Sequence, residues 1–202
     1  MATFTRPDNH TYTGSSAERL PAGGYVIKIY DIKPMKWPSG DDYFEVSFDI
    51  AEGDYKDFFK RDYNAQTSDN KWWRGTFPLN IIKDGDSEWA INRFWDFFYA
   101  VEDSNPGFRF SGDTSDINKK NFSKKILGAT FRREESRSKK DPSKTFWNTR
   151  VFHCVPAEQI RKGTFPMPKD KPLKDSVPST PSTDPDDFVN VPAGMDEEVP
   201  FD

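Results

Sequence analysis

Apolar and polar residues alternate most regularly between positions 43 and 50. The apolar members are Phe44, Val46, Phe48 and Ile50, with polar residues between them. A period of two is typical of an antiparallel strand with one buried face. The β-branched and aromatic run at residues 25–32 predicts a preceding strand. Glu52-Gly53-Asp54 predicts a tight turn, so the segment YKDFFKRDY is expected to return as the partner strand of a hairpin.

The spacing changes to that of a helix over residues 87–101. Apolar residues recur at helical intervals, namely Ile91, Phe94, Trp95, Phe98 and Val101. Asp86 or Ser87 can cap the first turn, and Asn105-Pro106-Gly107 ends the pattern. Two more strands are predicted at 124–134 and 145–155, joined by the basic segment ESRSKKDPSK. PAEQIRKG predicts a short helical turn that closes the body.

This order of elements predicts an all-β to α+β domain resembling an OB-fold. An OB-fold is a five-stranded Greek-key barrel, here with one helix between the third and fourth strands. We place the domain at residues 20–163, after a flexible arm at 1–19. Residues 164–202 hold eight of the sixteen prolines and three aromatic residues. Such a segment buries too little surface to offset its ordering entropy, so a disordered tail is expected.

The net charge of −4 conceals a strong asymmetry along the chain. Residues 164–202 hold three lysines and nine acidic residues, a net of −6, which leaves 26 basic and 24 acidic residues before them. Residues 118–150 hold eleven basic and three acidic residues, a net of +8. The sequence therefore predicts a basic surface followed by an acidic tail.

Basic and aromatic residues gather in the segments that an OB-fold uses to grip nucleic acid, which are strands two and three and the loops 1–2 and 4–5. Single-strand binding needs cations for the phosphates and flat rings for unpaired bases. The predicted contacts are Lys36, Trp37, Lys60, Arg61, Tyr63, Trp72, Trp73, Arg74, Arg132, Arg133, Lys139, Lys140, Lys144, Trp147 and Arg150. Adjacent strand residues face opposite ways, so at most one of Trp72 and Trp73 should point inward. Phe146 and Trp147 compete for the same groove, and the pattern leaves that choice open.

The residues give little basis for catalysis. His10 and His153 are the two histidines, and a lone pair of His153 with Cys154 lacks the four ligands typical of a metal site. The sequence shows no phosphate-binding glycine motif and no convincing catalytic triad. We therefore expect no enzymatic activity, cofactor or metal. A nuclease metal site could be formed by Asp41, Asp42, Asp49, Asp54 and Asp57, but their positions around a hairpin turn fit solvated turn residues better.

Composition also indicates a location. A single cysteine excludes an intrachain disulfide and favours a reducing compartment. The first residues, MATFTRPDNHTYTG, lack the apolar region of a signal peptide, and no stretch has the length of a transmembrane helix. We expect a cytoplasmic protein without membrane association.

The last eight residues, MDEEVPFD, are similar to the acidic tip of bacterial single-stranded-DNA-binding proteins. That tip docks on replication and repair proteins, with the Phe in an apolar pocket and the carboxylates on a basic rim. The resemblance implies a partner site at Asp196, Glu197, Glu198, Pro200 and Phe201. Asp202 follows the Phe, which displaces the terminal carboxylate by one residue.

Three segments stand out across residues 20–168 of the body: LPAGGY at the first strand, the strand YFEVSFDI, and Asn148-Thr149-Arg150 ahead of VPAEQIRKG. With these segments the body resembles a family of small bacteriophage proteins that coat single-stranded DNA. This resemblance implies an OB-type fold, single-strand binding in replication or recombination, and a viral origin in a host cytoplasm. The alternative is a protein-interaction or regulatory module that uses its aromatic surface without nucleic acid. Neither the oligomeric state nor a preference for DNA over RNA can be read from the sequence.

Overall fold

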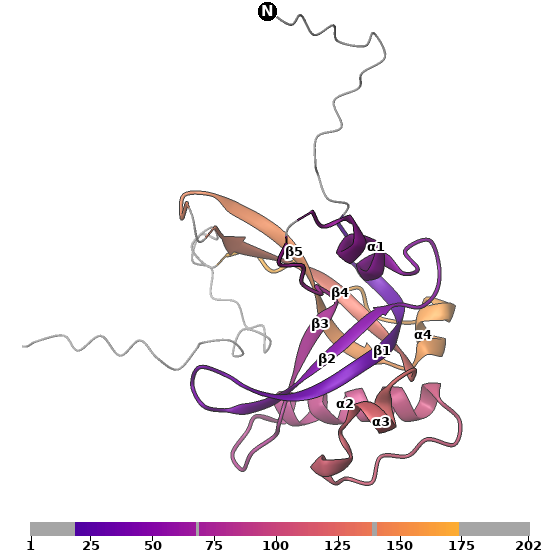
Figure 1. Cartoon of the computed structure of the whole chain (residues 1–202). Coiled ribbons are helices and arrows are strands. Elements are labelled where there is room, and N and C mark those ends of the chain that lie inside the picture. Colours follow the sequence, from indigo (N-terminus) through magenta and orange to yellow (C-terminus); the bar gives the residue numbers. More distant parts are fainter. Residues whose placement is uncertain (1–18, 68, 139–140, 174–202) are drawn as a thin grey trace, which may run out of the picture.

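The computed structural model describes residues 19–67, 69–138 and 141–173 (Figure 1). The strands are β1 (Gly23–Lys36), β2 (Asp42–Ile50), β3 (Thr76–Asn80), β4 (Ile126–Arg137) and β5 (Thr145–Val155). The helices are α1 (Phe58–Ala65), α2 (Glu88–Ser104), α3 (Lys119–Phe122) and α4 (Ala157–Lys162), with a 3₁₀ turn η1 (Thr114–Asp116). The predicted α+β class and the strands predicted at 25–32, 43–50, 124–134 and 145–155 are confirmed.

The five strands form one antiparallel sheet in the order β3-β2-β1-β4-β5. The outer strands β3 and β5 do not pair with each other within the described residues, so the sheet is not closed into the predicted barrel. Two features oppose closure. β3 has five residues, and its central Pro78 cannot donate a hydrogen bond to a further strand. On the other side, β5 packs against α2.

The prediction that YKDFFKRDY returns as a hairpin strand is wrong. This segment contributes to α1, and the third strand of the sheet is β3. Buried Asp49 explains this difference. Its Oδ1 accepts the backbone N–H of Phe59 at 2.8 Å, and its Oδ2 accepts that of Lys60 at 3.0 Å. These N–H groups belong to the first turn of a helix, where they have no intrahelical partner. The tertiary cap from β2 therefore outweighs the strand preference of the aromatic residues.

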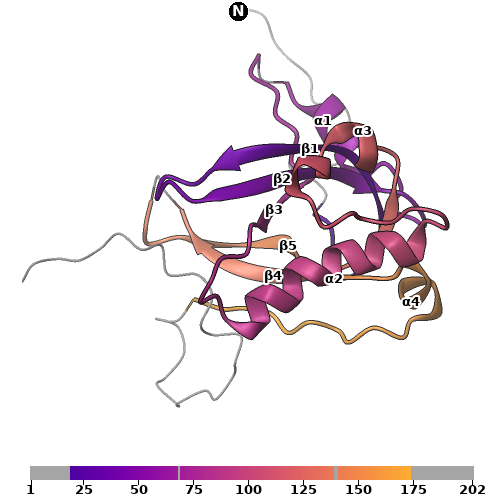
Figure 2. The same cartoon turned by 90° about the horizontal axis from the view of Figure 1, so that it is seen from below.

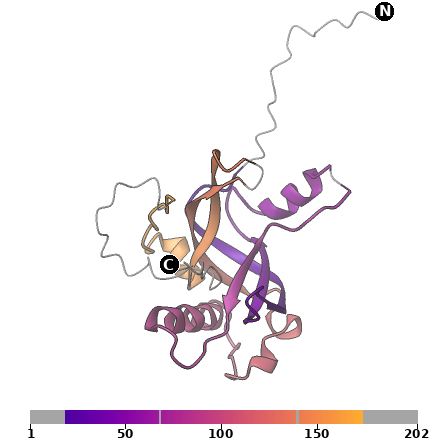
Figure 3. The same cartoon turned by 90° about the vertical axis from the view of Figure 1, so that its left-hand side faces the viewer.

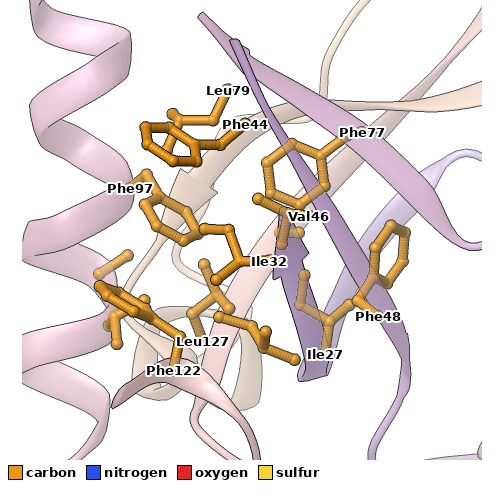
Figure 4. Packing of buried hydrophobic residues seen from close by; sticks show 14 of the residues in the cluster. Ile27, Ile32, Phe44, Val46, Phe48, Phe77, Leu79, Phe97, Phe122 and Leu127 are labelled. Carbon is orange, nitrogen blue, oxygen red and sulfur yellow. The ribbon is translucent and has the colours of Figure 1, made fainter. Parts of the chain in front are cut away.

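The core lies between the sheet and α2, with α3 closing one end (Figure 4). β1 contributes Ile27, Ile29 and Ile32. The step from Ile29 to Ile32 requires a β-bulge, and the register with β2 shifts there. Because of the bulge, Tyr30 is the extra residue, and its ring contacts Trp73 outside the core.

α2 begins as predicted, with the Ser87 hydroxyl accepting the N–H of Ala90. Its buried face differs from the predicted stripe. Trp95 is 45% exposed and Ile91 is half-buried, whereas Phe97 and Ala100 are fully buried. Phe97 stacks on Phe122 of α3 with ring centroids 5.9 Å apart.

The body continues beyond residue 163, where the tail was expected to begin. Lys171 pairs in parallel with β4, donating its N–H to Arg133 O and accepting from Glu135 N. The ring of Phe165 lies where a Cβ on Gly24 would stand, only 2.4 Å away. Residues 164–173 are therefore a strap along β4. Residues 1–18 of the predicted arm and residues 174–202 of the predicted tail, including its acidic tip, lie outside the described residues. Among the described helices, none is both long and apolar enough to cross a bilayer.

Candidate nucleic-acid interface

Two long hairpins extend from one side of the molecule. The β1–β2 and β4–β5 hairpins extend toward the same side in Figure 1, and both ends remain on that side after the rotation to Figure 2. Figure 3 looks onto this side, where β3 also lies, while the connection from α1 to β3 projects at the margin of that view. The structure thus gathers the two predicted loops and β3 on one side.

Trp37 lies at the end of the β1–β2 hairpin, and two other side chains hold its ring in place. Its ring stacks on Tyr43 with centroids 4.3 Å apart and an interplanar angle of 25°. Its indole Nε1 donates to Asn80 Oδ1 at 3.1 Å. With 37% exposure, Trp37 keeps part of its surface open to solvent. The stack and the hydrogen bond fix its orientation before any ligand arrives.

The cations beside Trp37 are already paired. Lys36 is the last residue of β1, and its Nζ lies 2.6 Å from the Asp42 carboxylate. Lys83 pairs with Asp41, and this hydrogen bond holds the pKa of Asp41 below its ordinary value. Lys36 therefore offers less uncompensated charge than predicted.

Trp73 is a structural residue. Its indole Nε1 donates to Phe48 O and to Gly75 O, both at 3.1 Å. Its ring contacts Tyr30 at 5.6 Å and Tyr63 at 6.0 Å. These contacts hold the α1–β3 connection against the sheet.

Trp72 is 65% exposed, which agrees with the expectation that at most one of the two tryptophans points inward, although neither lies on a strand. Arg74 lies 5.6 Å from the centre of its ring and also pairs with Asp62 at 2.9 Å. Tyr63 is 36% exposed, with Lys71 Nζ 5.8 Å from its ring centre. Trp72 and Tyr63 are thus available aromatic surfaces.

Lys60 and Arg61 lie on α1 and not on a strand, because of the helix described above. Both side chains are exposed, and neither forms an ion pair with another described residue. They add two positive charges to α1: Lys60 lies one helical turn before Tyr63, whereas Arg61, two residues before Tyr63, points from a different face of the helix.

Arg132, one of the predicted contacts, is largely buried and is paired within the described residues. Its side chain is 14% exposed, packs 4.2 Å from the ring centre of Phe152 and donates to Glu134 at 3.0 Å. Arg150, which is 61% exposed, pairs with the same carboxylate at 3.5 Å. One carboxylate thus offsets part of the charge of two arginines.

Arg133 lies on the other face of the hairpin, 5.4 Å from the ring centre of Trp147. It pairs with Asp170 of the strap, and this hydrogen bond lowers the pKa of Asp170. Trp147 is half-buried there, whereas Phe146 is 37% exposed. Phe146 is therefore the more accessible of the two rings that compete for the groove.

The loop between β4 and β5 is only partly described. Lys144 pairs with Asp141 at 3.2 Å. Lys139 and Lys140 lie outside the described residues. Of the predicted basic loop, the structure therefore describes only the residues on either side of Lys139 and Lys140.

Sequence reasoning missed three residues that support this surface: Tyr30, Tyr43 and Asn80. Tyr43 had a usable signal, because it lies one position before Phe44 and thus on the opposite face of β2. Tyr30 depends on the bulge, and Asn80 on the pairing of β2 with β3. Neither of those signals is local.

The described part of the chain contains no cluster of side chains that could serve as a metal site. No group of three or more His, Cys, Asp or Glu side chains there is arranged to hold an ion. Asp49, one of the aspartates considered for a nuclease site, is the buried cap of α1. Burial raises the pKa of the Cys154 thiol to about 12, which makes it a poor ligand or nucleophile.

Comparison with known proteins yields no assignment. No protein-family model matches this chain, and no curated protein is similar enough to be identified as a relative.

Proposed function

We propose that this protein binds single-stranded DNA without strong sequence preference, along the side that carries the two hairpins. The observation that carries the proposal is a set of exposed aromatic rings whose positions are fixed by neighbouring side chains. Trp37 is supported by Tyr43 and Asn80, and Trp72 by Arg74. Exposed aromatic rings that are held in place are suited to stacking on unpaired bases.

The strand order supports an OB-type domain as the finer description of the fold. Three strands, a helical segment and a closing hairpin follow one another as in that fold, whose Greek-key barrel is only partly closed. In this proposal the opening lies between β3 and β5, and the two hairpins are the nucleic-acid-binding loops.

Selectivity for single strands follows from the rings. Base faces are hidden inside a duplex, whereas the phosphates of duplex and single strand are equally accessible. Lys60, Arg61 and Lys71 supply charge for phosphates close to Tyr63 and Trp72. The resemblance to phage proteins that coat DNA supports roles in replication or recombination in a host cytoplasm. The acidic tail tip is proposed to recruit partner proteins.

The test is a titration of intrinsic tryptophan fluorescence with an unlabelled thirty-nucleotide single strand and with the matching duplex. Quenching by the single strand alone, weakened at higher salt, is the expected result. Trp95→Phe provides a matched control, since Trp95 lies on α2 and its loss should leave the binding curve unchanged. Absence of any change with both nucleic acids would reject the proposal and favour a protein partner for the aromatic surface.

A further inference from the structure

We infer that the described part of the connection between α1 and β3, residues 66–67 and 69–75, is a nucleotide subsite in which the open face of Trp72 stacks on one unpaired base. This inference rests on the proposed function and names one site within it. Trp72 belongs to no part of the core cluster, and its 65% exposure is the largest of any aromatic residue in the described ranges.

Gln66 fixes the backbone of Trp72 at two points. Its Oε1 accepts the Trp72 N–H at 3.0 Å, and its Nε2 donates to Trp72 O at 2.9 Å. This side-chain amide satisfies both polar groups of one peptide residue, as a neighbouring strand would. A loop residue with both backbone groups held has little freedom, so the ring is presented in one direction.

Arg74 occupies one side of the Trp72 ring and is itself held. Its Nη1 lies 2.9 Å from Asp62 Oδ1, and Asp62 Oδ2 also accepts from Gln66 Nε2 at 3.3 Å. The Asp62 side chain is only 15% exposed, so it has little freedom to move and both contacts are well anchored. Since no other described residue stacks on Trp72, its second face is open to a flat ligand.

The surroundings suit a nucleotide better than an apolar peptide. A hollow of about 800 Å³ adjoins the connection that carries Trp72 and is lined by Tyr63, Gln66, Thr67, Asp69, Asn70 and Lys71, without Trp72 itself among the lining residues. Most of this lining is polar, and Lys71 can meet a phosphate while Tyr63 lies below it. An apolar side chain would gain little there, whereas a base on Trp72 with its sugar and phosphate toward Lys71 uses both features.

Trp72→Ala tests the subsite directly. The expected result is weaker binding of a thirty-nucleotide oligothymidylate by about 5- to 150-fold, the range for loss of one base stack. Trp72→Phe should retain much of the affinity. Both variants should keep the thermal midpoint of wild type, because the ring lies outside the core. If the Ala variant proves unstable, Trp72→Leu takes its place, because it keeps an apolar side chain without a ring, and the same loss of affinity is expected.

An abasic oligonucleotide of equal length separates the base from the phosphates. The penalty of Trp72→Ala should largely vanish on this strand, because no base remains to stack. An equal penalty on both strands would overturn the stacking role. Wild-type affinity of Trp72→Ala for oligothymidylate would overturn the subsite while leaving the proposed function standing. Failure of wild type to bind any strand would instead reject the proposed function.

Gln66 is a positioning residue in this inference, and a double-mutant cycle tests it. Gln66→Ala should weaken binding in wild type but add little in the Trp72→Ala background, because its effect passes through that ring. Gln66→Glu keeps the acceptor for the Trp72 N–H and loses the donor, so an intermediate affinity is expected. Fully additive effects of the two alanine substitutions would exclude the positioning role.

Discussion

The buried carboxylate of Asp49 connects the fold to the candidate site, and its removal should be costly. Asp49→Ala leaves the N–H groups of Phe59 and Lys60 without their acceptor. Hydrogen bonds to a charged group contribute roughly 1.5–3 kcal/mol each, and the start of α1 can recover part of this from water. We expect a loss of roughly 3 kcal/mol in the free energy of unfolding.

Asp49→Asn provides the graded comparison. Oδ1 accepts from both Ile50 and Phe59, so a correctly oriented amide keeps these bonds and loses the one from Lys60. The expected loss is about 1–2 kcal/mol. Urea denaturation followed by far-UV circular dichroism measures both, with the larger loss lowering the midpoint by roughly 1–2 M. Midpoints of Asp49→Ala and wild type that coincide would refute the idea that this carboxylate specifies α1.

The difference in stability between wild type and Asp49→Asn should depend on pH, and the direction of that dependence follows from the pKa of Asp49. Burial raises the pKa of Asp49 above its ordinary value of 3.8, against the three backbone hydrogen bonds that lower it. The native state then binds the proton more tightly than the unfolded chain. The corresponding stability is present below the unfolded pKa and is lost as the pH rises through the native pKa. Wild type should therefore gain stability relative to Asp49→Asn as the pH falls toward 4. The opposite trend would mean that the hydrogen bonds outweigh burial.

Three further predictions concern the surface and the sheet. Asp170→Asn should release Arg133 and steepen the salt dependence of single-strand binding by about 0.7 in the log–log slope, measured by fluorescence titration. Truncation after Leu173 removes one lysine and eight acidic residues, so binding should tighten at low salt; unchanged affinity would exclude competition by the tail. Burial and then Tyr55 raise the pKa of Tyr25 to about 12, so Tyr25→Phe should remove a tyrosinate absorbance step at that pH.

The sequence predicted elements whose periodicity is local and missed those that depend on distant residues. β2 alternates over its whole length and α2 has a cap and a stop, so both were predicted close to their observed positions. α1 is a short aromatic segment whose pattern fits strand or helix, and the deciding contact comes from Asp49 on β2. β3 was missed because five residues around a proline give almost no strand signal.

The candidate site shows the same division. Charge and aromaticity selected segments that carry exposed rings, but Trp72 and Trp73 lie in a connection and not on a strand, so strand alternation did not decide which of them points inward. The sequence could not show that Arg132 is packed under Phe152 and Glu134, or that Arg133 pairs with Asp170 from the strap. A count of basic residues therefore overstates the available charge, because pairing across a sheet depends on register.

The two adjacent tryptophans explain how one short connection can be rigid and still offer a binding surface. Trp73 gives its indole N–H to the edge of β2 and fixes the connection to the sheet. Gln66 and Arg74 then hold Trp72, so the open ring needs no contact with the core. Since little ordering remains to be done on binding, more of the stacking free energy can appear as affinity. A flexible loop with the same composition would lose that advantage, which is why the support behind Trp72 argues for binding more strongly than its exposure alone.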